Sequence, residues 1–137
     1  MSPLQHTYER ILETLNDGVM ALSYSGEIVV FNHAAAEILG VPPEQVLGKR
    51  LIEIFFNDEA ENDEFTQTVF NAVYDKQQTL RVSAPYVSPQ GNRLFLEITT
   101  AYLEDGFKGV VVIFKDVTAY RSLYDEEREL TRQLSEA

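Results

Sequence analysis

Three predicted strands between Thr79 and Thr118 constrain the fold most. The turn sequences PQGN and EDG separate them, and turns this short join antiparallel neighbours. In RLFLEITTAYL the residues alternate between two faces, as the geometry of a strand requires. The third stretch, FKGVVVIFKDVT, has a continuous apolar centre, which predicts a central and well-covered strand. The alternating residues of the middle strand are Leu94, Leu96, Ile98, Thr100 and Tyr102 on one face, and Phe95, Glu97, Thr99 and Ala101 on the other.

Two further strands are predicted in VMALSYSGEIVVFN, joined at Ser25–Gly26. Helices are predicted before them at Leu4–Asn16, and after them in HAAAEILG, PEQVLG and a longer segment within Asp58–Lys76. Two strands alone are marginally stable, so all five are expected to join one sheet. The chain therefore predicts an α+β fold, with a five-stranded antiparallel sheet and helices on one face.

Composition narrows the classes of function. A chain of 137 residues fits one domain, and its formal net charge of −11 disfavours nucleic acid and anionic membranes as partners. There is no cysteine, which removes disulfides, thiolate metal sites and thiol nucleophiles. No apolar run approaches the ~20 residues that span a bilayer, and the N-terminus has no signal-peptide core. We expect a cytoplasmic protein, or a piece of one, without membrane contact in this segment.

Catalytic and metal-binding patterns are weak. His6 and His33 are too far apart to form a zinc site, and neither is placed for a catalytic triad. GKR lacks the earlier glycine and the Ser/Thr of a phosphate loop, and NDEAENDE lacks the glycine of a calcium loop. We expect no enzyme activity and no metal.

Four segments together resemble a PAS domain: FNHAAAEILG, PPEQVLGKRLIEIF, SPQGNR and the terminal FKDVT. The resemblance covers roughly residues 8–118. The matching positions are Asn32 and Ala34 of the family's Asn-x-Ala, Gly40, Gly48 with Lys49, Gly91, and Asp116 with Thr118 of its Asp-x-Thr. The resemblance implies a non-catalytic sensory domain, which holds a ligand between sheet and helices and passes strain to an effector through flanking helices.

The family's cofactors can be compared with the sequence. The absence of cysteine excludes the flavin–cysteine adduct and the coumaroyl attachment of the family's photosensors. Haem ligation by a histidine on the long central helix is disfavoured, since Asp58–Lys76 contains none. Non-covalent flavin stays open, although no tryptophan is present to stack on it.

The same residues are compatible with an apolar pocket or with a filled core. The filled core is the simpler interpretation, because aromatic side chains at these spacings usually fill space. A bound ligand would also need polar groups to orient it, for which Thr68, Asn71, Thr99 and Thr100 are candidates. The residues expected around this space are Phe55, Phe56, Phe65, Phe70, Tyr86, Leu96, Ile98, Val112 and Phe114.

The two ends of the chain carry narrow apolar stripes. The C-terminal stripe follows an a/d pattern with one polar interruption at Glu127, which is typical of a coiled coil. The division expected is a dimerisation helix at 1–17, the PAS domain at 18–118 and a signalling helix at 119–137. A helix folded back on its own sheet is the alternative. The stripe residues are Leu4, Tyr8, Ile11 and Leu15 at the N-terminus, and Tyr120, Leu123, Leu130 and Leu134 at the C-terminus.

These features predict a homodimeric sensory module of a bacterial signalling protein, with a histidine kinase, nucleotide cyclase or similar effector beyond it. Asp116 is expected to bond backbone amides near the domain's ends, and Thr118 to cap the following helix and relay the signal. A ligand-free dimerisation domain is the alternative. A small enzyme with a cavity carboxylate is a third, disfavoured because Glu97 faces away from Leu96 and Ile98.

Overall fold

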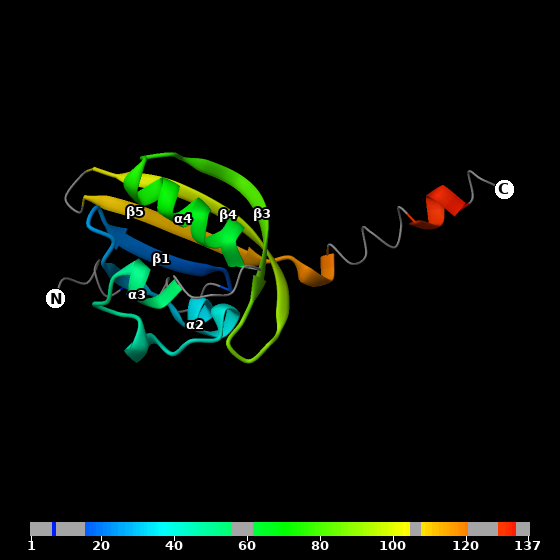
Figure 1. Cartoon of the computed structure of the whole chain (residues 1–137), viewed down its shortest axis with the longest axis horizontal. Helices are drawn as coiled ribbons and strands as arrows, with labels where there is room; N and C mark the ends of the chain where they lie inside the picture. Colours follow the sequence, from blue (N-terminus) through cyan, green and yellow to red (C-terminus); the bar gives the residue numbers. More distant parts are fainter. Residues whose placement is uncertain (1–6, 8–15, 56–61, 105–107, 121–128, 134–137) are drawn as a thin grey trace.

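A computed structural model describes residue 7 and residues 16–55, 62–104, 108–120 and 129–133. The described chain forms one five-stranded antiparallel sheet with strand order β2-β1-β5-β4-β3 (Figure 1). The predicted fold is thereby confirmed. The strands are β1 Gly18–Ser23, β2 Ile28–Phe31, β3 Thr79–Val87, β4 Arg93–Leu103 and β5 Gly109–Asp116.

The helices cover one face of this sheet, with α4 lying across it and α2 and α3 beside the β1–β2 edge (Figure 1). The predicted PEQVLG helix is the short 3-10 turn η1, and the predicted first helix lies outside the described residues except for Thr7. The long central helix begins at Asp63, after Asn62, while the predicted start at Asp58 lies outside the described part. The described helices are α2 His33–Leu39, η1 Pro43–Gln45, α3 Leu51–Phe55 and α4 Asp63–Tyr74.

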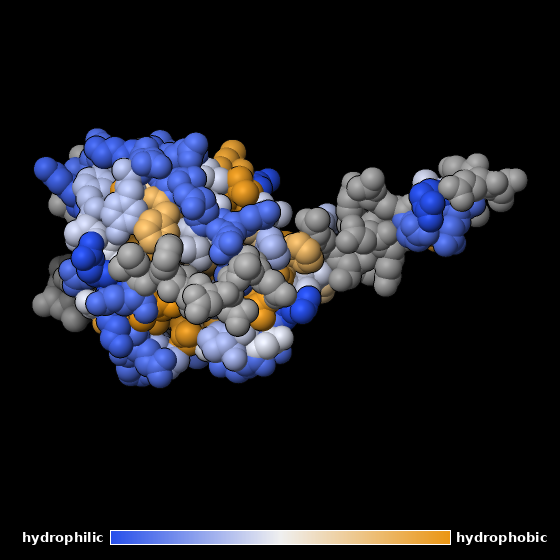
Figure 2. Space-filling view, viewed as in Figure 1, coloured by the Kyte–Doolittle hydropathy of each residue, from blue (hydrophilic) through white to orange (hydrophobic). Residues whose placement is uncertain are grey.

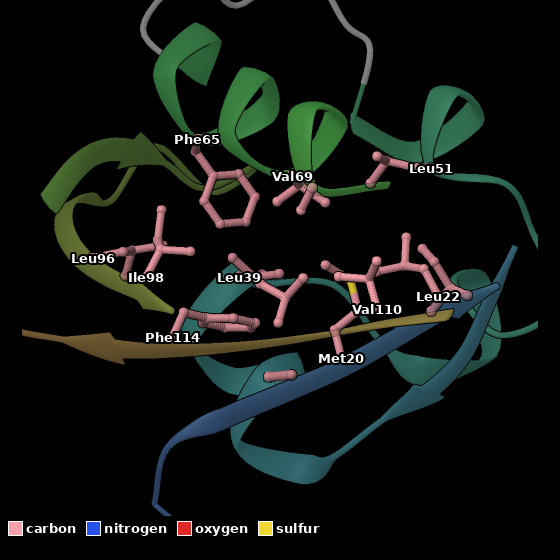
Figure 3. Packing of buried hydrophobic residues seen from close by; sticks show 14 of the residues in the cluster. Met20, Leu22, Leu39, Leu51, Phe65, Val69, Leu96, Ile98, Val110 and Phe114 are labelled. Carbon is pink, nitrogen blue, oxygen red and sulfur yellow. The ribbon is translucent and has the colours of Figure 1, made fainter. Parts of the chain in front are cut away.

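The register of the central strands gathers the apolar residues on the helix side. Ile98 lies opposite Phe114, and Thr100 lies opposite Val112. Figure 3 shows Phe65 of α4 pointing toward the sheet, with Ile98 and Phe114 on the opposite side of the core. The ring of Phe65 packs edge-on against Tyr86, with centroids 5.3 Å apart, and against Phe114 at 6.2 Å. This packing fixes α4 over β3, β4 and β5.

Asn32 connects the start of β1 to the start of α2. Its side-chain oxygen accepts hydrogen bonds from the backbone N–H of Ala35 and of Val19, both at 2.9 Å. Its amide nitrogen donates to the carbonyl of Asp17 at 3.0 Å. The first contact caps α2, and the other two hold the chain where it enters the sheet. This is the structural reason for an asparagine at the end of the second strand.

Candidate functional site

The predicted pocket residues meet between α4 and the sheet. Six of them are almost fully buried and pack in one cluster, part of which Figure 3 shows from close by, with Phe65, Leu96, Ile98 and Phe114 labelled. Phe70 is half-buried against this cluster and pairs with Tyr74, with ring centroids 5.3 Å apart. Phe56 and the side chain of Phe55 lie outside the described residues. The six are Phe65, Tyr86, Leu96, Ile98, Val112 and Phe114.

The polar candidates already bond to the protein itself. On α4, the Thr68 hydroxyl donates to the carbonyl of Glu64, and the Asn71 side-chain oxygen accepts from Gln67 at 2.7 Å. On β4, the hydroxyls of Thr99 and Thr100 accept the backbone N–H groups of Arg81 and Thr79. The Thr99 and Thr100 bonds hold the start of β3 to β4. A ligand that used these hydroxyls would share them with the backbone.

Tyr86 joins the core to the C-terminal end of α2. Its hydroxyl donates a 2.8 Å hydrogen bond to the carbonyl of Leu39. Burial raises the pKa of Tyr86 to about 12, since the phenolate would have to form in an apolar environment. Tyr86 is therefore neutral at any physiological pH. It acts as a hydrogen-bond donor that holds β3 to α2.

Tyr102 differs from Tyr86 in its bonding. Its hydroxyl is buried and has no hydrogen-bond partner among the described residues. Burial, and secondarily the neighbouring Tyr24, raise the pKa of Tyr102. The sequence pattern placed Tyr102 on the helix-facing side of β4 but gave no sign that its hydroxyl would be unpaired. Among the buried side-chain polar atoms of the described residues, the Tyr102 hydroxyl is the one without a hydrogen-bond partner.

The tip of the β3–β4 hairpin is held by two sets of polar contacts. Gln90 donates from its side-chain amide to the carbonyl of Gly40, 2.9 Å away, at the end of α2. Asn62, at the start of α4, exchanges two hydrogen bonds with the backbone of Val87. Sequence reasoning missed both contacts: Gln90 lies in the SPQGNR segment but only its glycine was matched to the family, and Asn62 belongs to no segment that was matched to the family. Their contacts fix the hairpin beside the exit from β5.

The end of β5 and the turn after it contain the predicted relay residues, Asp116 and Thr118. The Asp116 carboxylate accepts the backbone N–H of Thr118 at 3.0 Å and also the Thr118 hydroxyl. The same hydroxyl accepts the backbone N–H of Phe95 at 2.9 Å, and the N–H of Val117 donates to the carbonyl of Phe95. Asp116 thus bonds a backbone amide as expected. Among the described contacts, Asp116 bonds the first residue of the following turn and Thr118 bonds to β4; the predicted capping by Thr118 stays a prediction, because residues 121–128 lie outside the described part.

Most of the predicted dimer helices lie outside the described residues, including Leu4, Tyr8, Ile11, Leu15, Leu123, Glu127 and Leu134. Of the C-terminal stripe, Tyr120 is 76% exposed and Leu130 is 59% exposed. Figure 1 shows residues 129–133 apart from the sheet and its helices, so this turn does not pack on the domain. Glu129 and Arg132 form an exposed ion pair there.

Metal-binding chemistry has little support in the described part. His33 pairs with Glu37 at 2.8 Å on the exposed side of α2. Among the described residues, no group of three or more histidine, aspartate or glutamate side chains could hold a metal ion. Within the same residues, no helix is both long enough and apolar enough to cross a membrane.

Comparison with known proteins identifies the fold family. The model of the PAS fold matches residues 7–117. Phytochrome C from Oryza sativa subsp. indica is 23% identical over 124 residues, which cover 85% of this chain and 11% of the relative. The chain thus spans about a tenth of the length of the curated relatives that it matches.

Solved structures agree with that match. The PAS domain of a protein from Colwellia psychrerythraea has a TM-score of 0.63 and 17% identity, covering 85% of this chain and 98% of the other. A PAS domain from a two-component sensor histidine kinase gives 0.62 and 17%, covering 85% and 99%. An RNA-binding light-oxygen-voltage receptor gives 0.68 and 14%, covering 94% of this chain and 37% of the other. At these identities the likeness shows the fold.

Proposed function

The chain belongs to the PAS fold family, and from this premise we propose that it is a non-catalytic sensory signalling module. It forms a homodimer and passes a small-molecule or conformational signal through its C-terminal helix to an effector in the same protein. A cytoplasmic bacterial signalling protein, with a histidine kinase or nucleotide cyclase as effector, is the parent that we propose. The similarity to a PAS domain from a sensor histidine kinase supports this parent.

The observation that carries the proposal is the bonding of Thr118. Its hydroxyl accepts from the backbone of Phe95 in β4 and donates to the Asp116 carboxylate, which in turn caps the start of the next helical turn. A change in the pairing of β4 and β5 therefore reaches the first residues of the exiting helix directly. Helix shifts of this kind transmit signals when the helix has two discrete arrangements.

The signal would enter from the core side of β4 and β5. Ile98 and Thr100 of β4 and Val112 and Phe114 of β5 face the core beneath α4. A ligand between α4 and the sheet would displace these side chains. Closely packed interiors transmit such displacements because they have little free volume to absorb them. The proposed ligand is small and predominantly apolar.

A ligand screen with two readouts tests this proposal. The whole chain is titrated with a panel of small apolar metabolites while its thermal unfolding and its sedimentation are recorded. We expect a dimer whose unfolding midpoint rises with one compound, since a ligand that binds only the native state stabilises it. A control carries Val69→Trp, which puts a larger side chain where the ligand is proposed to lie and should abolish that rise; a cooperative unfolding transition of the variant shows that it still folds.

The ligand-free dimerisation domain is the second candidate. The dense packing around Phe65 supports it, because the predicted pocket residues contact one another directly. A dimer with no stabilising compound in the panel would favour this candidate. A monomer unaffected by every compound would contradict both.

A further inference from the structure

A hollow of about 360 Å³ lies at the root of the C-terminal helix. It adjoins the core beneath α4, because Tyr86 belongs to that core and also lines the hollow. Thr118, the residue that links β4 to the exiting helix, is part of its lining. The other lining residues are Pro85, Tyr86, Val87, Arg93, Leu94 and Phe95.

The pairing of the strands determines the chemistry of this hollow. Pro85 lies opposite Phe95, and Val87 lies opposite Arg93, so these four side chains share the sheet face that points away from α4. Three of them are apolar and partly exposed, while Arg93 provides a cation at the exposed end of the hairpin. An apolar floor with an adjacent guanidinium suits an aromatic side chain, because the ring can pack on the floor and attract the cation.

Tyr120 is such a side chain, and it is close to the hollow along the chain. It lies two residues after Thr118 and leaves 76% of its surface exposed, so it does not occupy the hollow of its own copy. It is also the first residue of the predicted coiled-coil stripe. In a parallel two-stranded coil, the first seam residue of one helix lies beside the root of the other helix.

We propose that the hollow receives Tyr120 from a second copy of this chain. The contact is isologous: each copy inserts its Tyr120 and offers its own hollow, as a two-fold axis requires. The match rests on the ring, which fits the apolar floor and can contact the Arg93 guanidinium beside it. The inference rests on the dimer of the proposed function and adds the residue that aligns the two exit helices.

Disulfide cross-linking tests the contact directly, because the chain contains no cysteine of its own. One tagged copy carries Val87→Cys, a differently tagged copy carries Tyr120→Cys, and the two are expressed together. A disulfide forms only when the two Cα atoms approach within about 7 Å. We expect a cross-linked product that contains both tags.

The matched control replaces Val87→Cys with Leu80→Cys. Leu80 is exposed on the same strand, seven residues away, which is roughly 20 Å at the rise of a β-strand. A mixed product no more abundant than this control, in a preparation that sediments as a dimer, would overturn the inference and leave the proposed dimer intact. A monomer in sedimentation would overturn the dimer and the inference together.

Dimer affinity provides an independent measurement. Removal of the ring by Tyr120→Ala should weaken dimerisation roughly tenfold or more, and Arg93→Ala should do so by a smaller factor. The double variant should be no weaker than Tyr120→Ala alone, because the cation then has no ring to contact. Fully additive effects would show that the two residues act separately and would contradict the contact. Thermal unfolding of each variant controls for changes in the fold.

Discussion

The backbone N–H of Phe95 donates a 2.9 Å hydrogen bond to the hydroxyl of Thr118, so the first residue of the exit turn is bonded to β4. Leu96, the next residue of β4, lies opposite Asp116, which accepts from Thr118 in turn. Strand pairing and helix start are thus connected through one threonine side chain. The proposed relay at the end of the last strand requires a connection of this kind.

Removal of the Thr118 hydroxyl should weaken the connection between the exit turn and β4, leaving the backbone bond from Val117 to Phe95. Thr118→Val keeps the shape of the side chain and leaves the N–H of Phe95 without its acceptor. We expect the free energy of unfolding to fall by about 1–2 kcal/mol, the usual cost of an unpaired, partly buried amide. Urea denaturation measures this loss. Thr118→Ser retains the hydroxyl and is the control; an equal loss in both variants would contradict a role for the bond.

Asn32 is expected to be more sensitive, because it is buried and makes three polar contacts. Asn32→Ala removes the cap of α2 and the acceptor for Val19, at a cost of roughly 2–4 kcal/mol. Asn32→Asp keeps the acceptor oxygen but buries a carboxylate whose second oxygen faces the Asp17 carbonyl, so it should also be destabilised at neutral pH. It should recover part of the loss at low pH, where the protonated carboxyl can donate again. Chemical denaturation of both variants at neutral and low pH tests this. A loss for Asn32→Asp that does not change with pH would contradict the contact with Asp17.

The sequence predicted the sheet well because its signals are local. Alternation in β4, the apolar centre of β5 and the hairpin turns each depend on a few adjacent residues. The start of β3 is a different case: Arg81 has a positive φ of 52° and the register shifts between Thr79 and Val82. Nothing in the letters TLRVS indicates that bulge, since the hydroxyls that stabilise it belong to Thr99 and Thr100 of another strand.

The candidate site was predictable in its apolar part for the same reason. The period-two pattern of β4 and the family resemblance together placed Leu96, Ile98 and Phe114 in the core. The polar contacts could not be derived, because Gln90 meets Gly40 across fifty residues of sequence and only the folded chain brings them together. The bond between the N–H of Phe95 and the Thr118 hydroxyl is a similar case, since its two partners lie on different segments of the chain.

Gly40 should be harder to replace than Gly48, although both have a positive φ. A Cβ at Gly40 would lie 2.2 Å from the side-chain oxygen of Gln90, whereas the space around Gly48 is open. Each alanine variant incurs about 1 kcal/mol of left-handed strain. Gly40→Ala should lose about 1 kcal/mol more, because Gln90 must move and give up its bond to the Gly40 carbonyl. Thermal unfolding of the two variants checks the difference, and equal losses would contradict the role of Gln90.

Tyr86 should make stability depend on pH in the alkaline range. An exposed tyrosine in the unfolded chain has a pKa of about 10, whereas the pKa of Tyr86 is raised to about 12. Between these values the folded state retains a proton that the unfolded state has lost, so stability falls as pH rises from about 10 to 12. Below pH 10 both states are protonated and the contribution is constant.

The size of that fall follows from the two pKa values, and amounts to about 2–3 kcal/mol over the whole range. Tyr86→Phe should remove this part of the pH dependence. It should also lower stability at neutral pH by about 1 kcal/mol, through the lost bond to Leu39. Urea denaturation at pH 8, 10 and 11 distinguishes the variant from the parent. Parallel curves for the two proteins would show that Tyr86 ionises equally well in both states.

Tyr102→Phe is expected to have the opposite effect at neutral pH. The hydroxyl of Tyr102 is buried without a partner among the described residues, so its removal costs no hydrogen bond within them. Unpaired buried polar groups destabilise the native state, and their replacement by an apolar group of the same shape is neutral or favourable. We therefore expect the unfolding midpoint of Tyr102→Phe to equal or exceed that of the parent, while Tyr86→Phe falls below it. A drop in both variants would mean that the Tyr102 hydroxyl is bonded in solution, to water or to a ligand retained on purification. Mass spectrometry of the undenatured protein distinguishes these two partners.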